Sequence, residues 1–83
     1  MEAGLNSDIQ VKNQTYHIQT EDWGWDNPFI VTKIFCQGAV LKSFKTPYQE
    51  VLNSPFQENQ SIRSAIELQH NKILDRLISG HIS

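Results

Sequence analysis

Residues 29–45, FIVTKIFCQGAVLKSFK, carry the strongest structural signal in the chain. Both arms of this segment are rich in β-branched and aromatic residues, which favour strands. Gly38 lies between the arms, and glycine readily adopts the positive φ that a tight hairpin connection needs. The segment therefore predicts a β-hairpin, which indicates a fold rather than a reaction.

A second hairpin is predicted upstream. Apolar and polar side chains alternate within residues 9–12 and 15–20, and a period of two indicates strands with one buried face. The turn is expected near Asn13. Residues 1–7 are polar and are predicted to form a loose tail before a single domain over residues 8–80.

One long helix is predicted near the C-terminal end. Residues 61–79 repeat apolar side chains at helical spacing. Ser61 or Asn59 can cap the start of this helix, and Gly80 can end it. A short helical turn over residues 49–52 is expected to precede it.

Together these elements predict an α+β fold, in which an antiparallel sheet of about four strands in two hairpins carries the C-terminal helix on one face. The expected core comprises Val11, Tyr16, Ile18, Val31, Phe35, Val40, Phe44, Ile62, Ile66, Ile73 and Leu77.

Composition narrows the classes of function. The chain has 83 residues and a formal net charge of −2, with no basic block, which argues against nucleic acid as a partner. No apolar run reaches the ~20 residues of a membrane span. One cysteine and no export-type leader favour a cytoplasmic protein. A small domain without a disulfide often gains stability by association, so we expect self-association or another protein partner.

No cofactor, metal site or enzymatic activity is expected. His17, His70, His81 and Cys36 form none of the spacings that bind metals. Cys36 has no adjacent base that would make it a nucleophile, and the glycines form no phosphate-binding loop.

Two apolar features predict an interaction surface. Trp23 and Trp25 flank Gly24 in a loop, and tryptophan is favoured at interface hot spots. The alternative is that both rings cap one end of the core. Leu74 and Ile78 widen the apolar arc of the helix beyond what one sheet requires. A second subunit or the loops would cover that arc.

A polar group offers the alternative function. Glu21 and Asp22 are adjacent carboxylates, and His70 lies inside the apolar arc of the helix. If these residues met, they would form a small regulatory site for an ion or small ligand. The simpler interpretation is that the carboxylates bind backbone amides and that His70 is a half-buried boundary residue.

The chain also resembles a family of small bacterial proteins and domains of unknown function. The resemblance rests on YHIQTED at residues 16–22 with Gly24, NPFIVT at 27–32, Gly38 with Val40 and Leu41, KTPY at 45–48, and Gln69 and His70 before Gly80. It implies two hairpins followed by a helix, and it transfers no catalytic residue. It also implies that residues 20–22 meet Gln69 and His70, more as a buried polar network than as an active site.

Overall fold

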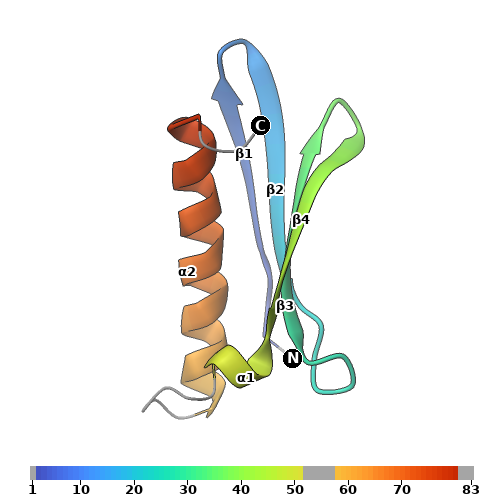
Figure 1. Cartoon of the computed structure of the whole chain (residues 1–83), viewed down its shortest axis with the longest axis vertical. Coiled ribbons are helices and arrows are strands. Elements are labelled where there is room, and N and C mark those ends of the chain that lie inside the picture. Colours follow the sequence, from blue (N-terminus) through green and yellow to red (C-terminus); the bar gives the residue numbers. More distant parts are fainter. Residues whose placement is uncertain (1, 52–57, 81–83) are drawn as a thin grey trace.

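The computed structural model describes residues 2–51 and 58–80. Four antiparallel strands form one sheet in the order β1-β2-β3-β4, and a C-terminal helix packs on one of its faces, so the predicted α+β fold is confirmed (Figure 1). The elements are β1 (Leu5–Val11), β2 (Gln14–Asp22), β3 (Phe29–Cys36), β4 (Ala39–Pro47), α1 (Tyr48–Val51) and α2 (Glu58–Ile78).

Two tight turns close the hairpins where the sequence predicts them. Lys12 and Asn13 have φ values of 49° and 69°, and Gln37 and Gly38 have values of 55° and 79°. Two successive residues with positive φ match the type I′ turn, whose twist suits a two-residue hairpin. Each strand therefore lies beside its neighbour in sequence.

Two boundaries differ from the prediction. β1 begins at Leu5, so the expected tail over residues 1–7 is wrong from Leu5 onward. Leu5 is followed by three short polar residues, so the sequence shows no apolar alternation before Ile9. In the structure Leu5 packs against a core cluster. The helix begins at Glu58 rather than Ser61. Residues 52–57, between the expected short helical turn and this helix, lie outside the described residues.

The core lies between α2 and the sheet, in two clusters. One joins Ile18 and Ile34 of the sheet to Ile73 and Leu77 of α2. The other contains four buried residues, Ile30, Tyr48, Ile62 and Ile66. Six residues of the predicted core are buried, namely Ile18, Val31, Ile62, Ile66, Ile73 and Leu77.

The predicted core of the main hairpin is partly wrong. The face of β3 beneath α2 carries Ile30 and Ile34, and Phe35 is only partly buried on the opposite face. Val40, which pairs with Phe35, is 52% exposed near the hairpin turn. Both faces of β3 are apolar, so period-two alternation cannot decide which one the helix covers. The remaining predicted core residues are partly buried: Val11, Tyr16 and Phe44.

Candidate functional site

Buried polar side chains meet between α2 and the sheet. Thr20 Oγ1 of β2 lies 2.7 Å from Thr32 Oγ1 of β3 and 2.8 Å from Nδ1 of His70 on α2. The other ring nitrogen of His70, Nε2, lies 2.8 Å from Ser7 Oγ of β1. Three strands and the helix are therefore joined through one histidine.

Gln69 extends this network to the fourth strand. Its Nε2 donates to Thr32 Oγ1 at 2.9 Å, and its Oε1 accepts from Thr46 Oγ1 of β4 at 2.5 Å. Thr32 Oγ1 accepts from Gln69, so the Thr32 hydroxyl can donate to Thr20 Oγ1. The Thr20 hydroxyl can in turn donate to Nδ1 of His70. Neutral His70 then donates from Nε2 to Ser7. One consistent set of donors thus crosses the whole sheet.

The structure therefore brings Thr20, Gln69 and His70 together. His70 is only 3% exposed, and both of its nitrogens are satisfied by hydroxyl groups. A satisfied buried network fixes how a helix sits on a sheet, because any displacement leaves polar groups without partners. We interpret this network as the element that sets the position of α2.

Burial lowers the pKa of His70 below the ordinary imidazole value. Above about pH 6.5 the ring is neutral in both the folded and unfolded chain. As the pH falls through that value, the unfolded chain binds the proton first, so the free energy of unfolding should decrease, by at most about 1.4 kcal/mol per pH unit for one proton.

Urea unfolding between pH 7.5 and 5 measures this dependence. His70→Gln keeps hydrogen-bonding capacity without titrating, so its free energy of unfolding should change less with pH. His17→Gln is the matched control, because His17 lies on β2 and pairs with Asp8 at 2.8 Å in an exposed contact. An unchanged pH dependence in His70→Gln would contradict the assignment.

Asp22 belongs to a separate network at the end of β2. It accepts from Tyr48 Oη, from Gly24 N at 3.0 Å and from Glu2 N at 2.7 Å. Burial raises the pKa of the Asp22 carboxyl, but these hydrogen bonds outweigh it, and the pKa lies below its ordinary value. Burial and the Asp22 carboxylate together raise the pKa of Tyr48. The carboxylate thus ties the loop and α1 to the sheet.

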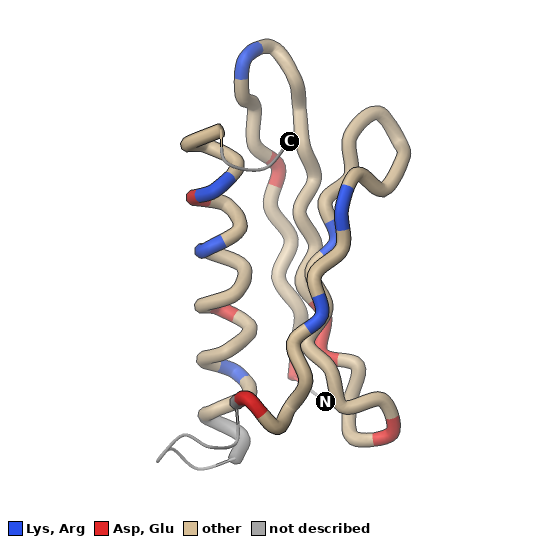
Figure 2. Tube along the Cα trace, in the orientation of Figure 1, with Lys and Arg blue, Asp and Glu red and all other residues tan. Residues whose placement is uncertain are grey.

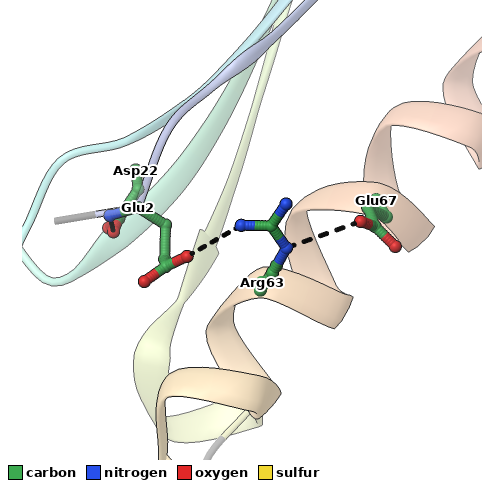
Figure 3. Close-up of polar contacts among 4 residues, drawn as sticks. All are labelled: Glu2, Asp22, Arg63 and Glu67. Carbon is green, nitrogen blue, oxygen red and sulfur yellow. Dashed lines mark hydrogen bonds and ion pairs between the residues drawn. The ribbon is translucent and has the colours of Figure 1, made fainter.

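The N-terminal segment joins this network to the helix. The carboxylate of Glu2 lies 3.5 Å from Arg63 of α2, and Arg63 lies 3.9 Å from Glu67 one turn along (Figure 3). Both ion pairs are exposed or partly exposed, so each contributes little to stability. Glu2 thus contacts Arg63 through its side chain and Asp22 through its backbone N–H.

The residues of the alternative ligand site do not form one site. Glu21 lies next to Asp22 on β2, and successive strand residues point to opposite faces. Glu21 accepts a hydrogen bond from Gln19, whereas Asp22 binds Tyr48 and His70 binds Thr20 and Ser7. The structure therefore divides this predicted group among three locations.

The two tryptophans have different surroundings. Trp23 is partly buried, and Lys45 Nζ lies 4.9 Å from its ring centroid. Trp25 is exposed and meets the ring of Tyr48 edge-on at 4.8 Å. The loop thus presents one ring to solvent, and its role in interaction stays a prediction.

The two helix residues predicted to form an interface also differ. Leu74 is partly buried and packs against the cluster that contains Ile73 and Leu77. Ile78 is exposed in the last turn of α2. Within the described residues Leu74 thus belongs to the margin of the core, and a charge introduced there would disturb the fold as well as any interface.

A groove of about 820 Å³ lies between β4 and α2. α2 packs mainly on β1, β2 and β3, which leaves the helix-facing side of β4 uncovered. Phe44, Ala65 and Ile73 give the groove an apolar floor, and Leu68, 60% exposed, lies at its margin. The other lining residues are polar or charged: Ser43, Lys45, Thr46, Glu50, Ser61, Ser64, Gln69, Lys72 and Arg76.

The sequence interpretation did not include this groove. Leu68 falls on the polar side of α2, away from the apolar stripe, where it suggests no contact. A signal was present, since Leu68, Lys72 and Arg76 are spaced by four residues and therefore share one side of the helix. What the sequence could not provide was the element opposite them, which is β4.

The outer edge of β4 presents backbone groups to the groove side. The carbonyl oxygen of Phe29 accepts a hydrogen bond from Trp23 N, so it points away from β4. Pro47, which lies opposite Phe29 on β4, has no N–H to donate. Phe29 and Pro47 are therefore a non-hydrogen-bonded pair, and antiparallel pairs alternate. The register makes Val31–Lys45 and Lys33–Ser43 non-hydrogen-bonded too. The backbone N–H and C=O groups of Ser43 and Lys45 consequently point away from the sheet.

Within residues 2–51 and 58–80, no group of three histidine, cysteine or acidic side chains is placed to hold a metal ion. No helix in the same residues has the length and hydropathy needed to span a membrane. Comparison with known proteins found no matching protein family, no matching curated protein and no matching solved structure. The resemblance to small bacterial proteins stays a prediction.

Proposed function

We propose that this chain is a non-catalytic protein-interaction module that binds an extended segment of another polypeptide along β4. The main support for this proposal is that the free edge of β4 lies beside the groove between β4 and α2. β4 is one of the two edge strands of the sheet, and the groove against α2 runs beside it.

Strand addition explains both features. A peptide that pairs with a sheet edge obtains affinity from main-chain hydrogen bonds, and pockets beside the edge read alternate side chains. Ser43 and Lys45 supply the outward N–H and C=O groups. The floor formed by Phe44, Ala65 and Ile73 supplies the apolar contact.

The same geometry supports a binding role rather than catalysis. The lining of the groove contains serine and lysine but neither histidine nor cysteine. The pair that most resembles a nucleophile and base, Ser7 and His70, is not part of that lining, and His70 is buried. A substrate in the groove would not reach them.

Ser43→Pro tests the mode of binding. The backbone N–H of Ser43 points outward, so proline removes a donor to the added strand and leaves the β3–β4 ladder intact. Linear peptides are first selected from a displayed random library against the wild-type chain. Ser43→Pro should weaken the best peptide by roughly ten-fold or more, the equivalent of one net hydrogen bond, and Ser43→Thr should bind normally.

Nuclear magnetic resonance identifies the contact surface. The selected peptide should shift and protect the amides of Ser43 and Lys45, and circular dichroism should show that Ser43→Pro keeps the fold. Peptides that shift only the loop around Trp25, or a library that yields no peptide acting on β4, would contradict the proposal.

A further inference from the structure

We propose that the segment bound along β4 is acidic, with carboxylates at alternate positions facing α2. This inference rests on the proposed function and adds the chemistry of the partner. Its occupant is a segment of a different polypeptide rather than a second copy of this chain.

The groove is basic although the chain is acidic. Lys72 and Arg76 line it with a single carboxylate, Glu50, whereas the whole chain has a net charge of −2. Lys45 also lines the groove, but its ammonium lies over the rings of Trp23 and Phe29. Lysine and arginine positions follow both α2 and β4 (Figure 2). An acidic segment would therefore meet a complementary potential, which steers association and selects among partners.

The helical cations are available for a partner. Among the described residues, neither Lys72 nor Arg76 forms an ion pair. By contrast, Arg63 on the same helix already forms ion pairs with Glu2 and Glu67. An arriving carboxylate would thus gain Lys72 and Arg76 without breaking an existing contact.

The spacing of the helix suits an added strand. Leu68, Lys72 and Arg76 succeed one another by about 6 Å along α2. Residues on one face of a strand repeat by about 6.8 Å. Both α2 and β4 follow the long axis of the molecule (Figure 1). Three successive side chains on the inner face of the bound segment can therefore lie opposite Leu68, Lys72 and Arg76. This match favours a segment with an apolar residue opposite Leu68 and acidic residues at the next two inward positions.

A second copy fits this edge poorly. Antiparallel pairing of β4 with itself would bring together two copies of a strand that carries Lys42 on one face and Lys45 on the other. Like charges on neighbouring strands are destabilising, and lysines on an edge strand are a common protection against such pairing. The charges of β4 thus oppose self-pairing and favour an acidic strand.

Two synthetic ten-residue peptides test the inference. Both share one valine- and threonine-rich sequence, and they differ only in carrying two glutamates or two lysines at alternate positions. Fluorescence anisotropy is measured at low and high salt with the wild-type chain. The glutamate peptide should bind about ten-fold or more tightly than the lysine peptide at low salt, and salt should reduce that difference.

Charge-reversal variants locate the effect. Lys72→Glu with Arg76→Glu should reverse the preference between the two peptides. Lys12→Glu makes the same kind of charge change at the β1–β2 turn, outside the groove lining, and should keep the wild-type preference. Ser43→Pro should weaken the glutamate peptide, which separates strand addition from general attraction to a basic surface.

Each outcome distinguishes the two proposals. Equal binding of both peptides along β4 would overturn the acidic partner and leave strand addition standing. Glutamate binding that survives Ser43→Pro would overturn strand addition. A concentration-dependent dimer that shifts the Ser43 and Lys45 amides would overturn the separate partner in favour of a second copy.

Discussion

Replacing Asp22 with alanine should lower the free energy of unfolding by about 3 kcal/mol or more, since two buried donors each lose a charged acceptor. Tyr48 Oη and Gly24 N both bind this carboxylate inside the protein, and Glu2 N binds it from the N-terminal segment. A chain of this length has a total stability of roughly 4–12 kcal/mol. One side chain at the end of β2 thus supports a large share of the fold.

Urea unfolding of a double-mutant cycle isolates this interaction. Asp22→Ala, Tyr48→Phe and the double variant should give a coupling free energy of roughly 1–3 kcal/mol. Asp22→Asn keeps one acceptor oxygen and provides a measurable variant if alanine prevents folding. Asp26→Ala, at an exposed position of the same loop, should change stability by less than about 0.5 kcal/mol. Additive effects of Asp22→Ala and Tyr48→Phe would contradict a direct bond.

The fold could be predicted because its signals are local. Gly38 and Asn13 mark the turns, alternating residues mark the strands, and the periodic C-terminal segment marks the helix. Each signal depends on neighbours within a few positions, and short turns force adjacent strands to pair. The structure adds no strand or long helix beyond those expected within the described residues.

The packing could not be predicted to the same degree, because it depends on residues far apart in the sequence. β3 has two apolar faces, and only the position of α2 selects Ile30 and Ile34 over Phe35. Asp22 and Tyr48 are separated by 26 positions and bind each other only because the register of three strands places them together. Thr20 and His70 are 50 positions apart, and their contact likewise depends on where the helix lies.

The proposed site illustrates the same limit. Leu68 has no large apolar neighbour on its side of α2, so the sequence assigns it to solvent. It becomes part of a groove only because α2 packs over β1, β2 and β3 and leaves β4 uncovered. The outward backbone groups of Ser43 and Lys45 carry no sequence signal at all, since they follow from the register of β3 and β4.

The two faces of β3 provide the sharpest test of this packing. Ile34 is 0% exposed and packs with Ile18, Ile73 and Leu77 beneath α2. Ile34→Ala should therefore cost about 2–5 kcal/mol of stability, the range for a fully buried isoleucine. Phe35 is larger but only partly buried on the opposite face, so Phe35→Ala should cost clearly less than Ile34→Ala.

Thermal and urea unfolding of the two variants at several protein concentrations give the comparison. If the order is reversed, the open face of β3 must be buried by something other than α2. A reversal that appears only at high protein concentration would assign that cover to a second copy of the chain. The expected order at every concentration would instead assign the larger hydrophobic contribution of β3 to the side of α2, although Val31 on the opposite face is itself only 2% exposed.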